Sequence, residues 1–125
     1  MSIKKLPRCS SSPNCVCSEY PDDEEHYAKP LRVSGFIRND EVMKKLITAI
    51  TETGGVIVEQ KGHLLTATYT SKLLRFVDDV QARYDMENRQ VHIRSASRVG
   101  YYDFKANKAR VEAIRKAFSK QAVKP

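Results

Sequence analysis

The sequence predicts an α+β fold: a four-stranded antiparallel sheet (a meander) with two helices on one face and an irregular N-terminal segment. Two stretches, 39–53 and about 104–121, repeat apolar residues at the spacing of one helix face. Four stretches between them alternate apolar and polar residues, which is typical of strands with one buried side. Short turns join these strands, so consecutive strands should be antiparallel neighbours.

The two predicted helices each carry one apolar face. In the first, Asn39 or Asp40 can cap the N-terminus, and Gly54 and Gly55 end the helix. Its apolar face consists of Val42, Met43, Leu46, Ile47 and Ile50. The inner face of the second helix carries Val111, Ile114 and Phe118.

The four predicted strands cover 55–60, 63–71, 74–84 and 90–97. Strict alternation places one set of side chains under the helices: Leu65, Ala67, Tyr69, Phe76, Val80, Val91 and Ile93. The opposite, polar face should carry Asp79, Gln81, Arg83, His92 and Arg94 on an open surface. Asp79 and Arg94 are expected to form a cross-strand ion pair there.

Residues 1–31 are predicted to be an irregular segment packed on a single domain at 32–125. Four prolines interrupt regular structure in this stretch: Pro7, Pro13, Pro21 and Pro30. The acidic run Asp22–Glu25 is interpreted as a solvated loop. A chain of 125 residues fits one domain with its own core, so folding should not require a metal or a disulfide.

The formal net charge of +7 has no single focus, because Lys and Arg are scattered along the chain. No basic run or zinc-finger pattern appears, so there is no strong nucleic-acid signal. No apolar stretch approaches the roughly 20 residues of a membrane span. The basic start lacks the apolar stretch of a signal peptide, so a cytoplasmic location is expected.

The cysteines do not predict a metal site. Cys9, Cys15, Cys17 and His26 lack the paired spacing of structural zinc ligands, so no metal and no cofactor are expected. A Cys9–Cys15 disulfide in an oxidising compartment and a reduced, packed loop both remain open. Nothing brings a cysteine together with His63 or His92 as a base, so no catalytic residue is assigned.

The most suggestive segment for a ligand is 94–98, which carries two arginines and two serines shortly before a helix N-terminus. Asp78 and Asp79 are adjacent on a strand and therefore point to opposite faces. Asp78 shares the side of Ser95 and Ser97, whereas Arg94 does not. The candidate anion site therefore consists of Arg75, Asp78, Ser95, Ser97, Arg98, Asp103 and Asn107, with Asp78 as an internal competitor for the arginines.

Three functions remain open at this point. The leading hypothesis is a non-enzymatic binding or accessory module for a small anionic ligand or an acidic partner. The alternative is an enzyme that acts on an anionic substrate through the Arg/Ser/Asp cluster. A weaker third hypothesis is association with a membrane surface through the scattered Lys and Arg. An alternative structural interpretation of the cluster is a polar network that holds the strand ends.

Two motif regions carry a resemblance to a known family. They are Leu6–Cys15 (LPRCSSSPNC) and Thr70–Asp79 (TSKLLRFVDD), followed by Arg94–Asp103 with Asn107 and Arg110–Glu112. The chain resembles the bacterial and plastid family catalogued as domain of unknown function 1499, over about Leu6 to Arg115. The resemblance implies a shared fold and no established activity, although many relatives look exported or lipid-anchored. Cys17 and Tyr102 stand where the family usually has Ser, and Lys105 where it usually has Gly.

Overall fold

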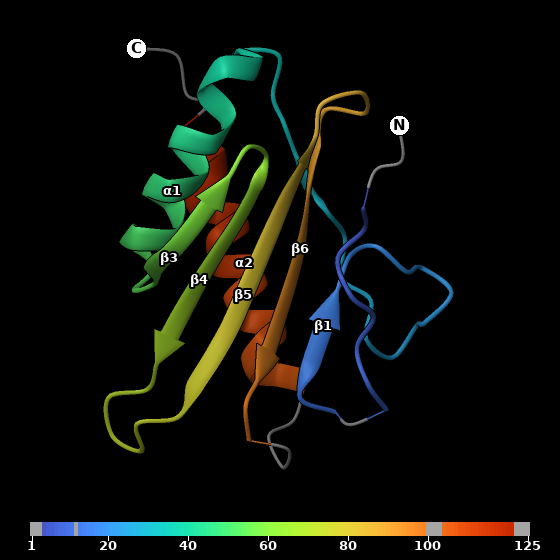
Figure 1. The fold of residues 1–125 in the computed structure, drawn as a ribbon, viewed down its shortest axis with the longest axis vertical. Coiled ribbons are helices and arrows are strands. Elements are labelled where there is room, and N and C mark those ends of the chain that lie inside the picture. The colour runs from blue at the N-terminus through green and yellow to red at the C-terminus, as the bar shows by residue number, and fades with distance from the viewer. Residues whose placement is uncertain (1–3, 12, 100–103, 122–125) are drawn as a thin grey trace.

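The computed structural model describes residues 4–11, 13–99 and 104–121, and it shows an antiparallel sheet with two helices (Figure 1). The sheet order is β1-β6-β5-β4-β3, and β2 also pairs with β6. The elements are β1 (Cys15–Cys17), β2 (Leu31–Arg32), the short 3-10 helix η1 (Asn39–Glu41), α1 (Val42–Glu52), β3 (Val56–Lys61), β4 (Leu64–Thr70), β5 (Val77–Asp85), β6 (Gln90–Ser97) and α2 (Phe104–Lys120).

The prediction of four strands was wrong, because the sheet has six. β1 pairs with β6 through Cys15 opposite Ala96, and β2 pairs with β6 through Leu31 opposite Val91. The two strands are only three and two residues long, too short to show the alternation by which strands are recognised in a sequence. β3 to β6 follow one another as antiparallel neighbours.

The third long strand begins at Val77 rather than at 74. The preceding residues form a turn in which the Ser71 carbonyl accepts the Arg75 amide at 3.0 Å. The Ser71 hydroxyl accepts the Phe76 amide, also at 3.0 Å. Arg75 has a φ of 58°, in the left-handed region that few non-glycine residues adopt. Phe76 is half-buried at the edge of this turn rather than in the core.

One hydrophobic core joins both helices to alternate residues of the sheet. α1 packs against α2 and β3, while α2 packs against β6 and β1. Figure 1 shows α2 running behind the sheet with α1 alongside it. The fully buried side chains of this core include Val16, Leu31, Leu46, Ile50, Leu65, Val80, Ile93, Ile114 and Phe118. Val16 and Leu31 show that the N-terminal third of the chain supplies part of the core.

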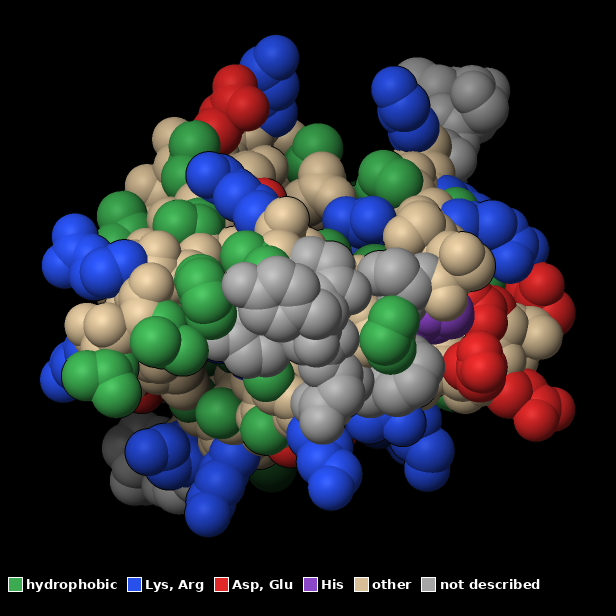
Figure 2. Space-filling model, turned by 90° about the horizontal axis from the view of Figure 1, so that it is seen from below, with side chains coloured by type: hydrophobic (Ala, Val, Ile, Leu, Met, Phe, Trp, Pro, Cys, Tyr) green, Lys and Arg blue, Asp and Glu red, His purple; other side chains and the backbone are tan. Residues whose placement is uncertain are grey.

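The other face of the sheet is only partly open, which corrects the expectation of an uncovered polar face. Over β5 and β6, Arg83 and His92 are each only 9% exposed, because residues of the N-terminal segment lie on them. At the β3 edge the surface is uncovered, and Val56 is 64% exposed. Figure 2 views the lower end of the molecule as drawn in Figure 1, and it shows Lys and Arg spread around that end and Asp and Glu mostly at one side. Among the described residues, no helix has both the length and the apolar character needed to cross a bilayer.

Candidate functional site

Three of the predicted site residues form one buried network where β6 meets α2. The Ser95 hydroxyl donates to Asn107 Oδ1 at 2.7 Å. Asn107 Nδ2 donates to the Asn14 carbonyl at 3.0 Å and contacts Ser97 Oγ at 3.2 Å. Ser95 and Asn107 are completely buried. The network therefore joins β6, α2 and the residue that precedes β1.

Asp78 lies on the helix side of the sheet and pairs with a residue that the candidate set did not contain. Its carboxylate forms an ion pair with Arg110 of α2. The Arg110 guanidinium also lies over the Tyr69 ring, 4.7 Å from its centroid. Asp78 is opposite Ser97 in the β5–β6 register. Its expected partners were the serine hydroxyls, Arg75 or Arg98, but the long Arg110 side chain reaches it from the helix.

Asp79 lies on the outer face and pairs with Arg98, not with Arg94. Arg98 Nε and Nη2 each donate to one carboxylate oxygen of Asp79 at 2.9 Å. Because of this bidentate contact, Arg98 lies in a solvent-exposed pair on the outer face, away from the side of the sheet that carries Ser95 and Asn107. Arg94 instead donates from Nη2 to the Arg8 carbonyl at 3.4 Å, and its Nε has no hydrogen-bond partner among the described residues.

Arg75 does not join the other candidates either. It is exposed in the β4–β5 turn, and it forms no ion pair with any of the described residues. Asp103 lies outside the described residues. The predicted cluster is thus divided: Asp78, Ser95, Ser97 and Asn107 come together, whereas Arg75 and Arg98 do not join them. The buried members satisfy one another, which is the arrangement of a structural network.

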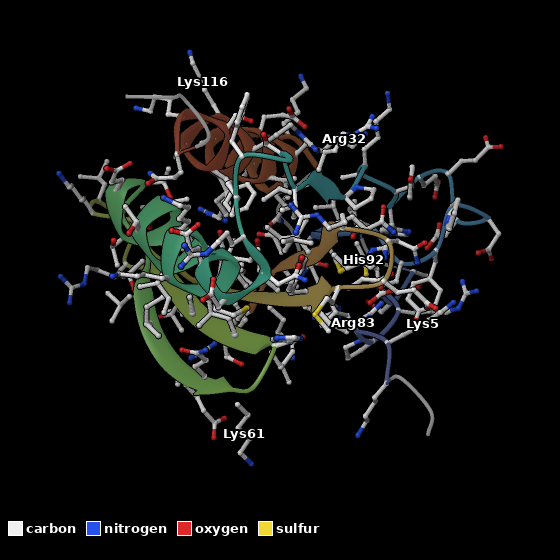
Figure 3. All side chains as sticks on the ribbon, turned by 90° about the horizontal axis from the view of Figure 1, so that it is seen from above. Lys5, Arg32, Lys61, Arg83, His92 and Lys116 are labelled. Carbon is white, nitrogen blue, oxygen red and sulfur yellow. A yellow bond between two sulfur atoms is a disulfide. The ribbon has the colours of Figure 1, made fainter. Side chains whose placement is uncertain are left out.

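A second buried polar cluster, which sequence reasoning missed, attaches the N-terminal segment to the outer face. Glu19 accepts from Arg83 Nε at 2.7 Å and Nη2 at 2.8 Å, and from the Leu6 amide at 3.2 Å. His92 Nε2 is 3.6 Å from Glu19 Oε1. Figure 3 shows Arg83 and His92 beside the N-terminal segment. Glu19 and Arg83 are 64 residues apart, so no sequence spacing indicated the pair.

Ser18 and His92 lie as close together as a catalytic serine and its general base, but the surroundings of Ser18 are those of a structural residue. Ser18 Oγ lies 2.9 Å from His92 Nδ1 and accepts the Ile93 amide at 2.8 Å. The serine is only 2% exposed, so a substrate has no access to its hydroxyl. The hydroxyl takes the place of a backbone acceptor between the N-terminal segment and β6, because it accepts a β6 amide. It therefore fixes the segment to the sheet.

Burial and pairing move the titration of two groups in this cluster. Burial acts to raise the pKa of Glu19, but the hydrogen bonds from Arg83 and Leu6 and the charges of His92 and Arg83 together lower it below the ordinary 4.5. Burial lowers the pKa of His92 below 6.5; the Arg83 charge adds to this, and the Glu19 and Asp85 carboxylates oppose it. Both groups therefore bind protons less readily in the folded state.

Stability is accordingly expected to fall with acid in two stages. The unfolded chain binds more protons than the folded one below pH 6.5 through His92 and below 4.5 through Glu19. The free energy of unfolding should therefore decrease as pH falls through each window, and both contributions are complete above pH 6.5. Urea denaturation at several pH values measures this. Glu19→Gln should remove part of the lower stage and enlarge the upper one, because it removes a carboxylate that opposes the lowering of the His92 pKa; an unchanged lower stage would contradict the assignment.

The cysteines decide between the disulfide and the reduced loop that the sequence left open. Cys9 and Cys15 form a disulfide, so neither can also serve as a zinc ligand. The described residues contain no group of three or more His, Cys, Asp or Glu side chains arranged for a metal. Cys17 is a buried free thiol whose pKa is raised by that burial, the opposite of a reactive thiolate. Because disulfides are rare in reducing cytosol, the disulfide weighs against the expected cytoplasmic location.

A groove with a volume of about 680 Å³ lies where β2, the β5–β6 turn and the end of α2 meet. Four cations line it, Lys29, Arg32, Arg89 and Arg115. None of its described lining residues is a carboxylate. We call this the cationic groove. A second groove of similar size, on the outer face, has Lys4, Lys5 and Lys61 on its wall but also Asp85 and Glu87. Its charges therefore partly cancel.

The cations of the cationic groove differ in how they are held. Arg89 has a φ of 52° and donates to the Ser34 carbonyl at 2.7 Å and the Ile37 carbonyl at 2.6 Å. Its hydrogen-bond partners in the described part of the chain are all neutral, so no direct ion pair there cancels its charge. Arg115 is bound to Glu112. For Lys29 and Arg32 the described part of the chain supplies no ion pair, and Figure 3 shows Arg32 on the α2 side.

These features define a small α+β protein with an antiparallel sheet and two helices, in which the N-terminal segment is attached to the sheet through Glu19 and Arg83. The family model described as "Protein of unknown function (DUF1499)" matches residues 5–118. The chain therefore belongs to this family, which confirms the resemblance in its motifs. No curated protein and no solved structure matches the chain.

Proposed function

We propose that the protein is a non-enzymatic binding module that takes a small anionic ligand in the cationic groove. The observation that carries this proposal is the lining of that groove, which holds four cations and no described carboxylate. Its volume of about 680 Å³ falls within the range of small-molecule sites. The proposal retains the leading hypothesis from the sequence, a binding module for an anion, but it places the ligand in a different part of the molecule from the residues first proposed.

Lys29 and Arg32 are the residues that would contact the ligand directly. Arg89 uses its donors on carbonyl groups and on Asn39 Oδ1, so it contributes a fixed positive charge rather than a new hydrogen bond. A rigid charge that needs no reorganisation favours an anion at little entropic cost. Ser119 and Asn88, also on the groove wall, add neutral polar groups.

The enzyme alternative has no comparable support. Its Arg/Ser/Asp cluster would need an accessible carboxylate or hydroxyl, but Asp78 is paired with Arg110 and the Ser95 hydroxyl donates to Asn107. Both Asp78 and Ser95 are buried. An acidic partner protein remains the other form of the module hypothesis, and a glutamate-rich peptide serves as its probe.

Titration with inorganic phosphate, sulfate and citrate tests the proposal, with the melting temperature and the heat of binding as readouts. Arg32→Gln should weaken phosphate binding about tenfold or more, because a charge-assisted contact is worth about 1.5–3 kcal/mol. Lys61→Gln removes the same charge from an exposed position outside this groove and should leave binding unchanged. Equal loss in both variants, or loss in Arg98→Ala instead, would refute the groove assignment.

A further inference from the structure

The turn between β4 and β5 presents two adjacent leucines to solvent. Leu73 is 90% exposed and Leu74 is 58% exposed. Single exposed apolar residues are ordinary on protein surfaces. Two adjacent exposed leucines at the tip of one turn are less common. Here they are also flanked by two cations, Lys72 before them and Arg75 after them. Figure 1 shows the turn extending beyond the end of the sheet.

The turn is fixed by hydrogen bonds rather than by packing of the leucines. The Ser71 amide donates to the Phe76 carbonyl at 2.9 Å, and the Ser71 hydroxyl and carbonyl accept the amides of Phe76 and Arg75. These bonds close the turn at its base. The leucines are thus held outward without any contribution to the core, so the core does not explain their presence.

The charges around the tip are positive and uncompensated. Within residues 4–11, 13–99 and 104–121, no carboxylate forms an ion pair with Lys72 or Arg75; the nearest aspartates in sequence, Asp78 and Asp79, pair with Arg110 and Arg98. Figure 2 shows hydrophobic side chains next to Lys and Arg on this end of the molecule. A tip that combines apolar side chains with cations complements a surface that is apolar inside and anionic outside.

We infer that the β4–β5 turn docks the protein onto an anionic lipid surface, with Leu73 and Leu74 inserted at the headgroup boundary. Lys72 and Arg75 would contact the lipid headgroups beside them. A protein partner is a poorer fit, because a stable interface needs roughly 1,000 Å² of complementary surface and two side chains on a convex tip supply far less. A bilayer accepts a convex tip and supplies the negative charge.

This inference is independent of the proposed ligand site. The turn precedes β5 and the cationic groove includes Asn88 and Arg89 just after β5, so the two lie at opposite ends of that strand. Nine residues of strand span about 30 Å. Failure of phosphate binding would therefore leave the lipid inference standing, and the reverse also holds.

Co-sedimentation with vesicles measures the docking. We expect binding to phosphatidylcholine vesicles that contain about 30 mol% phosphatidylserine, weakened by salt, and little binding to phosphatidylcholine alone. Lys72→Gln and Arg75→Gln should each lower the partition coefficient about fivefold. The double substitution Leu73→Ser and Leu74→Ser should lower it about tenfold or more and leave the melting temperature unchanged, because neither leucine is in the core.

A fluorescent reporter tests insertion separately. The chain has no Trp, so Leu73→Trp introduces a single probe at the tip. Its emission should shift to the blue with anionic vesicles. Phe36→Trp places a matched probe at another site that is 66% exposed, beside the groove end of the molecule, and should not shift. Absence of vesicle binding, binding that ignores the leucines, or equal shifts in both probes would overturn the inference; so would a leucine-dependent dimer without lipid.

Discussion

Glu19→Gln is expected to lower the free energy of unfolding by about 3–5 kcal/mol, the usual cost of leaving one member of a buried ion pair alone. The Glu19 side chain is 1% exposed and that of Arg83 is 11% exposed. Glutamine keeps the shape and one acceptor, but it cancels the charge that both guanidinium contacts require. The N-terminal segment should then loosen from the outer face, because the same carboxylate also accepts the Leu6 amide.

The chain contains a matched control for this prediction. Asp79 and Arg98 form the same bidentate contact, at 2.9 Å, but their side chains are 38% and 57% exposed. Asp79→Asn should cost no more than about 1 kcal/mol, since water screens the pair. Urea denaturation of both variants gives the comparison. Similar losses would mean that burial does not set the strength of the Glu19–Arg83 pair.

A double substitution separates the pair from its surroundings. Glu19→Leu with Arg83→Met removes both charges together and should recover part of the stability lost in Glu19→Gln. Recovery would show that the penalty in the single variant comes from the orphaned Arg83 charge. A double variant less stable than the single one would instead place the penalty in lost shape and hydrogen bonding.

Local patterns predicted the two helices and the long strands because each of those elements is long enough to show its period. Gly54, with a φ of 101°, ends α1 in the left-handed conformation that glycine favours. Alternation likewise placed Asp78 and Asp79 on opposite faces of the sheet, where Asp78 pairs with Arg110 and Asp79 pairs with Arg98. The same reasoning failed for β1 and β2, because two or three residues have no measurable period.

The partners of the charged residues could not be predicted in the same way. Strand alternation gives a face, but a long arginine side chain can reach any carboxylate within several ångströms of its own position. Arg110 reaches Asp78 from α2, 32 residues away in sequence, and Arg98 crosses to Asp79 on the neighbouring strand. The cationic groove was missed for a related reason, since Lys29, Arg89 and Arg115 come from three separate parts of the chain.

The Asn107 network makes a second prediction of large effect, because it joins three segments mainly through neutral groups. The one charged group at Asn107 is the Arg110 guanidinium, which donates to Asn107 Oδ1 at 3.4 Å. Asn107→Leu keeps the approximate volume but removes the acceptor for the Ser95 hydroxyl and the donor to the Asn14 carbonyl and Ser97 Oγ. Each buried polar group left without a partner costs about 1–3 kcal/mol. The variant should therefore be about 3 kcal/mol or more less stable than the parent chain.

The measurement is urea denaturation, with Ala109→Leu as the control at an exposed position of the same helix. The control should change stability by less than about 0.5 kcal/mol, as surface substitutions usually do. Hydrogen exchange should also rise in Asn107→Leu at the Ser97 amide, which donates to the Asn14 carbonyl at 2.8 Å and depends on that residue staying in place. If Asn107→Leu is as stable as the parent, the network does not hold β1 to β6, and its buried serines would again be candidates for a ligand.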